Sequence, residues 1–175
     1  MFNRILSIVA VVLLGFILIR SEMRMDRLED KLDDIVQTKD TIKYTPADVE
    51  CLTKNIYYEA GVEDQTGKYA VAHVTVNRVK TGKWGTDICK VVYARAQFSW
   101  TLKKKLPKPD PTLWAESKGI ALAVLEGARV RGLQKSLFYH ADYIKVPKWA
   151  DSTEHILTIG RHLFYNRAKD TKIYI

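Results

Sequence analysis

The feature that most constrains the structure and function of this sequence is one acidic side chain at the end of an apolar helical stripe. Residues 49–60 read VECLTKNIYYEA, in which Val49, Leu52 and Ile56 recur at the spacing of one helix face. Glu59 lies seven residues after Leu52, two turns further on, so its carboxylate falls on the same face. Apolar neighbours favour the protonated carboxyl, and a carboxyl that is neutral at about pH 6–7 can act as a general acid. A helix end that turns this side chain to solvent is compatible with the same periodicity.

Charge is divided unevenly along the chain. Residues 1–50 hold 7 of the 28 Lys and Arg and 9 of the 20 Asp and Glu, for a net charge of −2. Residues 51–175 hold the other 21 and 11, for a net charge of +10. The basic part suits a polyanionic partner, such as nucleic acid, an anionic membrane or an acidic cell-wall polymer. Charge alone does not distinguish these partners.

An uncharged apolar run, Ile5–Ile19, lies between Arg4 and Arg20. As a helix it is about 22 Å long, short of the roughly 30 Å hydrocarbon core, although flanking arginines can extend it to a thin span. No small-residue cleavage site follows, which favours an uncleaved signal anchor over a signal peptide. We therefore expect residues 1–20 to form a transmembrane helix that makes the chain single-pass in the inner, or cytoplasmic, membrane.

Residues 21–45 are expected to form a charged helical stalk and a linker. Four apolar residues follow the 3-4-3 spacing of a heptad seam: Met25, Leu28, Leu32 and Ile35. The seam is short, so we expect a monomer with at most weak self-association through the stalk. Thr45 is placed to cap a helix whose first residue is Pro46, which predicts a compact domain over residues 46–175.

Helical patterns precede strand patterns in this domain. Helices are expected over 67–79 before the stop at Gly82, over 86–94, and from Asp110 to a stop at Gly127. Short strands are expected at 137–139 and 163–165, on either side of a loop over 142–154, and an extended or looped segment at 97–100. Helices in the first two thirds and strands in the last third indicate an α+β fold, mainly helical with a small C-terminal β element.

Glu59, Glu63 and Asp64 form the strongest candidate cluster. If the helix continued past Gly61, Glu59 and Glu63 would lie one turn apart, and their repulsion would raise the pKa of one of them. Paired carboxylates suit glycosidic cleavage, where one protonates the leaving oxygen and the other acts as base or nucleophile. Ordinary loop acids at 63 and 64 are compatible with the same sequence. Several aromatic residues permit sugar stacking, although aromatic residues more often belong to a core: Tyr57, Tyr58, Trp100, Trp114 and Trp149.

Histidine and cysteine spacings predict no metal site, and the absence of phosphate- or dinucleotide-binding motifs predicts no cofactor. Cys51 and Cys89 each lie at the start of a predicted helix. A single disulfide in an exported domain and two buried thiols in a reducing compartment are both compatible with this spacing.

Short motifs occur in a fixed order between residues 49 and 166. They are NIYYEA at 55–60, Glu63, Gly67, AVA at 70–72, NRV at 77–79, VVY at 91–93, QFS at 97–99, FYHA at 138–141, WA at 149–150 and IGxHxFY at 159–165. Together they resemble the SleB-type cell-wall hydrolases, the cortex-lytic enzymes of spore germination and their phage and bacterial relatives. The resemblance implies a lysozyme-like fold that cleaves peptidoglycan between N-acetylmuramic acid and N-acetylglucosamine. Similar enzymes act as lytic transglycosylases, in which one glutamate protonates the glycosidic oxygen and then helps the muramic C6 hydroxyl close a 1,6-anhydro ring.

Glu59 matches that glutamate. The resemblance further implies that five residues bind the glycan: Glu63 as an assisting carboxylate, and Gln97, Ser99, Tyr139 and His140 as the lining of the cleft. Two departures concern substrate preference more than the reaction. Gly61 and Val62 interrupt the usual Glu-Ala-Arg-Gly-Glu run, and Lys68 stands where the family commonly has Gln.

The resemblance also bears on two questions left open above: where the protein is located and what it binds. It implies a catalytic domain that faces the periplasm or cell wall, with peptidoglycan strands as partner rather than nucleic acid and a membrane contact through the N-terminal helix. Export favours a Cys51–Cys89 disulfide. A phage lysis enzyme and a bacterial wall-remodelling enzyme fit equally well. The rival functions are a hydrolytic muramidase or glucosaminidase, and a non-catalytic basic module that binds wall or nucleic acid.

Overall fold

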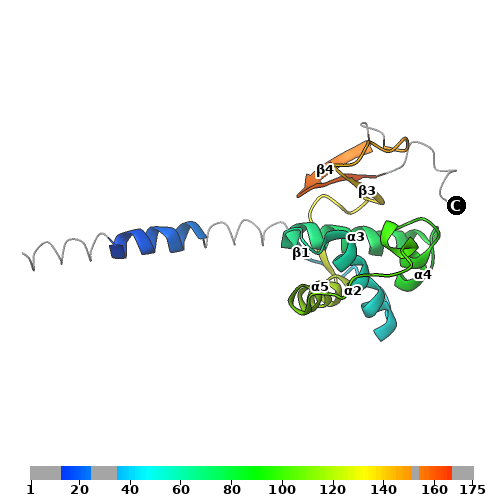
Figure 1. The fold of residues 1–175 in the computed structure, drawn as a ribbon, viewed down its shortest axis with the longest axis horizontal. Coiled ribbons are helices and arrows are strands. Elements are labelled where there is room, and N and C mark those ends of the chain that lie inside the picture. The colour runs from blue at the N-terminus through cyan, green and yellow to red at the C-terminus, as the bar shows by residue number, and fades with distance from the viewer. Residues whose placement is uncertain (1–12, 25–34, 151–153, 167–175) are drawn as a thin grey trace, which may run out of the picture. The chain divides into compact units, whose positions relative to one another are not determined.

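The computed structural model describes residues 13–24, 35–150 and 154–166. The chain divides into two compact units, Met1–Asp34 and Ile35–Ile175. Residues 13–24 are helical (Figure 1). Within the described part of the chain, no helix is both long enough and apolar enough to cross a bilayer. The predicted transmembrane helix falls largely on residues outside that part and stays a prediction.

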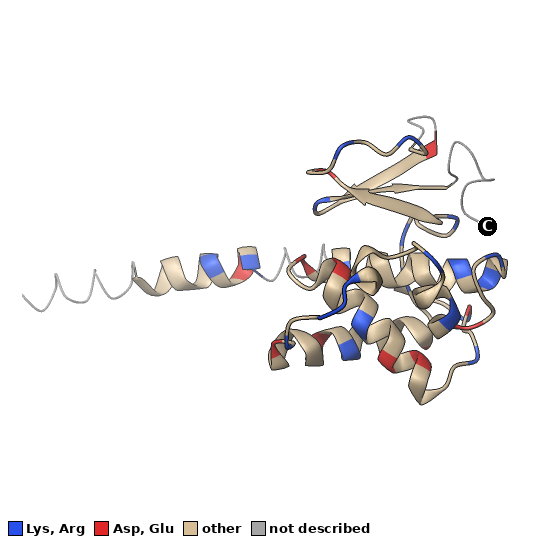
Figure 2. Cartoon of the chain, turned by 45° about the vertical axis from the view of Figure 1, so that its right-hand side comes forward, with Lys and Arg blue, Asp and Glu red and all other residues tan. Residues whose placement is uncertain are grey.

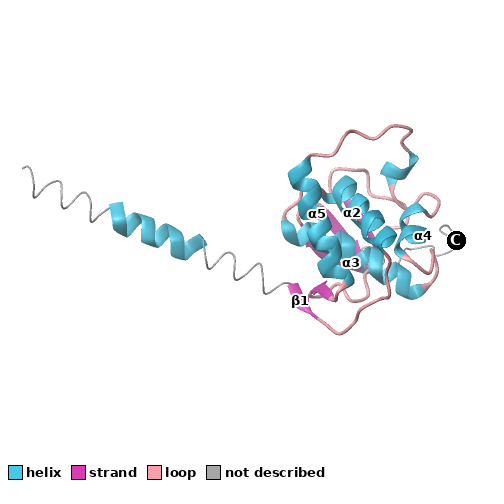
Figure 3. Cartoon of the chain, turned by 90° about the horizontal axis from the view of Figure 1, so that it is seen from below, coloured by secondary structure: helices cyan, strands magenta, loops and turns pink. Residues whose placement is uncertain are grey.

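Helices make up the larger layer of the second unit. They are α2 (Pro46–Ala60), α3 (Gln65–Thr81), α4 (Ile88–Tyr93), the 3-10 helix η1 (Ser99–Leu102) and α5 (Pro111–Leu125). Helix α2 packs against α3, α4 and α5, and Figure 3 shows α2, α3 and α5 side by side. Leu52 and Ile56 on α2 are completely buried in the core between these helices. The apolar stripe predicted from the sequence is therefore the face of α2 that packs against the other helices.

Local capping explains where the helices begin. Thr45 accepts a hydrogen bond from the Asp48 backbone nitrogen, and the Asp48 carboxylate accepts one from the Thr45 backbone nitrogen at 2.9 Å, forming a capping box. Asp87 and Asp110 cap α4 and α5. Gly82, which ends α3, has a φ of 67°, a left-handed conformation that favours glycine. These starts and stops confirm the helices predicted from the sequence.

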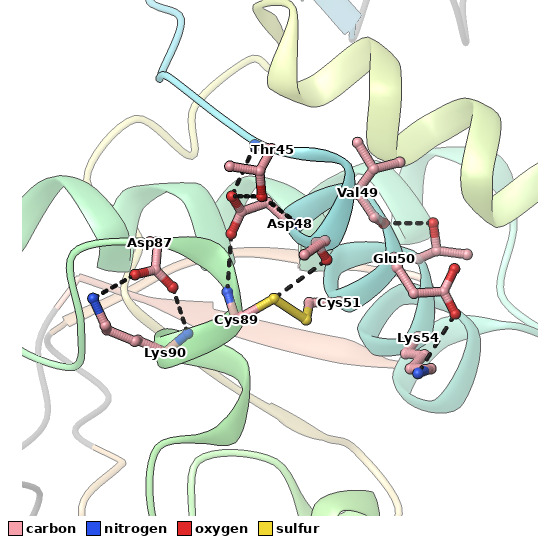
Figure 4. Close-up of a disulfide and its surroundings, with 11 residues drawn as sticks. Thr45, Asp48, Val49, Glu50, Cys51, Lys54, Asp87, Cys89 and Lys90 are labelled. Atoms are coloured by element: carbon pink, nitrogen blue, oxygen red, sulfur yellow. Dashed lines mark hydrogen bonds and ion pairs between the residues drawn. A yellow bond between two sulfur atoms is a disulfide. The ribbon is translucent and has the colours of Figure 1, made fainter.

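A disulfide joins two helices of this layer. Cys51 on α2 and Cys89 on α4 are bonded, with their Cα atoms 5.3 Å apart (Figure 4). Beside the disulfide, the Cys89 backbone nitrogen donates to Asp48 Oδ1 at 3.3 Å, so the capping carboxylate of α2 also holds the first turn of α4. The open point between a disulfide and two thiols is thus resolved in favour of the disulfide.

An antiparallel sheet of three strands forms the second layer, which Figure 1 shows on one side of the helices. Its strands are β3 (Phe138–Ala141), β4 (His155–Ile159) and β5 (His162–Tyr165), in the order β3-β5-β4. Tyr139 pairs with Phe164 across β3 and β5. Phe164 is fully buried in a cluster with Ala70 and Val74 of α3, which attaches the sheet to the helices. The two predicted strands are confirmed, whereas β4 was not predicted.

Two short strands contradict the last part of the expected helical stalk, at residues 35–37. β1 (Ile35–Gln37) pairs antiparallel with β2 (Ala128–Val130), and the Thr38 nitrogen donates to the Gly127 oxygen at 3.0 Å. Ile35 is therefore a strand residue of the compact unit, and its assignment to a helical heptad seam is wrong. The ladder partner far along the chain overrides the local helical spacing. The other three seam residues lie outside the described residues. The segment expected to be extended or looped at 97–100 is irregular at Gln97 and Phe98, as expected, but begins a 3-10 helix at Ser99.

Candidate active site

A cavity of about 530 Å³ opens beside the last turn of α2. Its walls come from α2, from residues 96–102, from β3, from the loop over 143–149 and from β5. Both layers of the fold thus contribute to one cavity. Five residues expected at the site are among those that line it: Glu59, Gln97, Ser99, Tyr139 and His140.

Glu59 is the acidic residue of the cavity wall. Its side chain is partly buried, and the Tyr139 hydroxyl donates a hydrogen bond to its Oε2 at 3.1 Å. Burial raises the pKa of Glu59, while this hydrogen bond and the charges of Arg78 and Lys103 act in the opposite direction. Burial also raises the pKa of Tyr139, so its hydroxyl stays a donor. In this arrangement the Glu59 carboxyl keeps its proton to a higher pH than a solvated glutamate does. When it is ionised, the Tyr139 hydroxyl donates a hydrogen bond to it.

Arg78 on α3 is a buried cation close to this carboxyl. Its Nε donates to the Leu137 oxygen at 2.8 Å, and its Nη1 has no hydrogen-bond partner within the described residues. The guanidinium lies 5.2 to 5.7 Å from three ring centroids, those of Trp84, Phe98 and Phe138. Burial lowers the pKa of Arg78 to about 10, and the neighbouring Tyr139 and Glu59 act to raise it. Because no described carboxylate forms an ion pair with Arg78, its charge is available to favour ionised Glu59.

His140 is held firmly in the wall. Its Nδ1 lies 2.9 Å from the Ala141 carbonyl oxygen, which can only accept, so Nδ1 carries the ring proton. The Nε2 atom lies 3.0 Å from the Tyr165 hydroxyl, and the two rings stack. With both nitrogens engaged, His140 contributes a rigid surface to the cavity.

Gln97 and Ser99 lie on a segment that a buried network positions. Trp100 Nε1 donates to Asn55 Oδ1 at 3.0 Å, and Asn55 Nδ2 donates to Thr75 Oγ1 at 3.1 Å. These bonds tie the start of η1 to α2 and α3. The segment also contains a left-handed residue other than glycine, Ala96, with a φ of 58°.

Glu63 lies outside the cavity wall. Helix α2 ends at Ala60, so the two glutamates do not share a helix face. Glu63 Oε2 instead accepts a hydrogen bond from the Arg161 backbone nitrogen at 3.2 Å, in the turn between β4 and β5. Asp64 caps α3 through the Gly67 nitrogen. The structure thus does not bring the expected assisting carboxylate to Glu59.

Several wall residues were not predicted. Tyr143, Ile144 and His162 line the cavity, and the His162 ring lies edge-on against Tyr139 at 5.2 Å. The family motif around position 162 was the available signal for His162, whereas Tyr143 and Ile144 lie in a predicted loop outside the quoted motifs. Of the five aromatic residues considered for sugar stacking, Tyr58 and Trp149 line the wall, whereas Tyr57, Trp100 and Trp114 do not. In the described part of the chain, no three His, Cys, Asp or Glu side chains gather as a metal site.

A sequence model of the family described as Cell Wall Hydrolase matches residues 62–165. The chain belongs to this cell wall hydrolase family. The match confirms the predicted SleB-type resemblance, and membership indicates a domain that acts outside the cytoplasm. The matched range begins just after Glu59 and includes the other expected site residues.

Two solved structures are similar to this cell wall hydrolase. The catalytic domain of Bacillus cereus SleB is 22% identical, with a TM-score of 0.60, over 74% of this chain and 98% of that chain. The catalytic domain of the germination-specific lytic transglycosylase SleB from Bacillus anthracis is 23% identical, with a TM-score of 0.56, over 70% and 96%. At these identities the likeness shows a shared fold, which confirms the α+β class. No curated protein sequence matches the chain.

Replacing the Tyr139 hydroxyl tests how the carboxyl of this cell wall hydrolase is tuned. The hydrogen bond favours ionised Glu59, so Tyr139→Phe should raise the pKa of Glu59 further. If Glu59 must be protonated to act, activity is lost as pH rises through this pKa. The basic limb of the pH–rate profile should then move to higher pH in the variant. Tyr93→Phe, which changes an exposed tyrosine outside the cavity wall, is the control. An unchanged basic limb in Tyr139→Phe would show that the hydrogen bond does not set this pKa.

Proposed function

We propose that this domain cleaves peptidoglycan glycan strands between N-acetylmuramic acid and N-acetylglucosamine as a lytic transglycosylase, with Glu59 as its acid and base. The observation that supports this most is the environment of Glu59. Its carboxyl is partly buried, its pKa is raised by burial, and it lies on the wall of a cavity of about 530 Å³. Family membership supports the substrate class.

The proposed reaction uses one carboxyl group twice. Protonated Glu59 gives its proton to the glycosidic oxygen as the bond from this oxygen to muramic C1 breaks. The carboxylate then takes the proton of the C6 hydroxyl on the same muramic residue, whose oxygen bonds to C1 and closes a 1,6-anhydro ring. Glu59 ends protonated, ready for the next cycle. Tyr139 and Arg78 favour the carboxylate that exists between the two proton transfers.

The charges on the cavity wall support this route over hydrolysis. Hydrolytic glycosidases commonly use a second carboxylate, about 5 to 9.5 Å from the first, as nucleophile or base. Among the described residues that line the cavity, Glu59 is the one acid, and Glu63 is engaged at the Arg161 turn. An anhydro-forming reaction needs no second carboxylate because the sugar supplies the nucleophile.

We further propose that the chain acts as a monomer anchored by residues 1–20 in the cytoplasmic membrane, with the catalytic domain facing the periplasm or wall. The disulfide between Cys51 and Cys89 supports an oxidising compartment for this domain.

A digest of purified sacculi by the full chain in mild detergent tests the reaction. Mass spectrometry of the released muropeptides should show 1,6-anhydro ends, which are lighter than reducing ends by one water. Reducing muramic ends would indicate a muramidase, and reducing glucosamine ends a glucosaminidase. Binding to sacculi without any release would indicate a non-catalytic wall-binding module.

A further inference from the structure

Two segments that wall the cavity are positively charged and contain no acidic residue. Residues 88–109 contain six Lys or Arg and no Asp or Glu, and residues 143–150 contain two lysines and no acid. Both segments contribute side chains to the cavity wall. Some of these lysines directly follow or precede wall residues in the sequence, as Lys103 follows Leu102 and Lys145 follows Ile144. Figure 2 shows blue segments on both the helical layer and the loop beside the sheet.

Six of these lysines form what we call the lysine rim: Lys103, Lys104, Lys105, Lys108, Lys145 and Lys148. All six are exposed, and none forms an ion pair with a carboxylate in the described ranges. Elsewhere lysines do find such partners, as Lys68 does with Glu116 at 2.7 Å. The charge of Lys103 also acts on the pKa of Glu59, so part of the rim lies within electrostatic reach of the carboxyl.

Apolar side chains are interleaved with the lysine rim. Leu102, Ile144 and Val146 are 69%, 46% and 63% exposed, and they adjoin Lys103 and Lys145 in the sequence. An exposed mixture of cations and apolar groups fits a ligand that carries both carboxylates and small apolar side chains. In a strand with its peptides attached, the lactyl carboxyl of muramic acid is an amide, so the sugars are uncharged and the carboxylates lie on the peptides. A polymer of phosphates needs no apolar contact.

We propose that the lysine rim binds the carboxylates of the stem peptides that project from muramic acid, so the preferred substrate is a glycan strand with its peptides attached. The inference rests on the proposed function, because a strand held in the cavity places its peptides at the opening. Each lysine–carboxylate contact at such a surface is weak and screened by salt, so selectivity comes from several contacts together.

Binding can be measured apart from cleavage in chains that also carry Glu59→Gln. The rim variant combines Lys104→Gln, Lys105→Gln, Lys108→Gln and Lys148→Gln. The control removes the same charge from four exposed lysines outside both segments, Lys39, Lys43, Lys83 and Lys118. Both are sedimented with sacculi freed of wall phosphates. A second batch has its carboxylates converted to amides with carbodiimide and ammonia, and a third retains its phosphate polymers.

The rim variant should bind phosphate-free sacculi about 10-fold more weakly than the control at about 0.01 M ionic strength, with no difference at about 1 M. The difference should disappear on amidated sacculi. Equal weakening in the control, or a difference that persists after amidation, would overturn the inference. A difference confined to phosphate-bearing sacculi would overturn it in favour of wall phosphates. Cleavage by the wild-type chain is scored separately, so sacculi left intact would reject the proposed function and not the rim's binding.

Discussion

Glu59→Gln is expected to lower the release of muropeptides from sacculi by roughly 10²–10⁴-fold, the range typical of a lost general acid. Glutamine keeps the shape of the side chain and can still accept the hydrogen bond from Tyr139, so the fold should be unchanged. A carboxamide cannot deliver a proton to the glycosidic oxygen or take one from the C6 hydroxyl. Release is measured by chromatography of the soluble products, and folding by circular dichroism and thermal melting.

Glu50→Gln provides the matched control for this variant. Glu50 lies on the same helix but is exposed, and its ion pair with Lys54 at 3.5 Å is a surface pair of small energetic weight. Both variants replace one glutamate of α2 by glutamine, so a loss confined to position 59 assigns the effect to the cavity. Retention of more than about a tenth of the wild-type rate by Glu59→Gln would fall outside that range and contradict the proposed mechanism.

Removal of the disulfide by Cys51→Ala with Cys89→Ala should lower the free energy of unfolding by about 4 kcal/mol, from the loop-closure entropy of a 38-residue separation. The bond joins α2, which positions Glu59, to α4, which leads into the wall segment at 96–102. Its loss should therefore also weaken the packing between these parts. Urea unfolding followed by tryptophan fluorescence measures the change as a lower midpoint.

Reduction of the wild-type chain should reproduce this loss, while the same reductant should leave the double variant unchanged. Together these measurements separate the cross-link from any effect of the substituted side chains. Equal unfolding midpoints for oxidised and reduced wild-type protein would contradict a stabilising disulfide. The rate of muropeptide release in a reducing buffer then shows whether the loss of stability also impairs the active site.

Sequence patterns predicted the helices well because their signals are local. Thr45 and Pro46 start α2 within a few residues of one another, and Gly82 stops α3 by its own backbone conformation. The helical period put Glu59 in line with the apolar face of α2 but was also compatible with a side chain turned to solvent, and the structure places it on the cavity wall. β1 was missed because its pairing partner, Ala128–Val130, lies far along the chain, beyond all the helices of the domain. Three residues are also too few to show a strand pattern that outweighs a helical spacing.

Residues of the candidate site could be predicted where they belong to a motif of the family. Gln97 and His140 were assigned by family resemblance, and both lie on the cavity wall. Arg78 was part of a motif, but only the packed structure reveals that its guanidinium is buried near Glu59 and forms no ion pair with any carboxylate that the structure describes. The position of Glu63 depended on whether α2 continued past Gly61, which the composition of that turn did not decide. Tertiary contacts, rather than residue types, determine these two roles.

The β1–β2 pair has a practical consequence for recombinant fragments of the enzyme. A fragment that starts at residue 46, where the helical pattern begins, would lack Ile35–Gln37 and leave the Ala128–Val130 edge without its backbone partner. It would also lack the Asp40 carbonyl, to which the buried Arg129 guanidinium donates. A start before residue 35 retains both, which makes it the sounder boundary for expression and crystallisation.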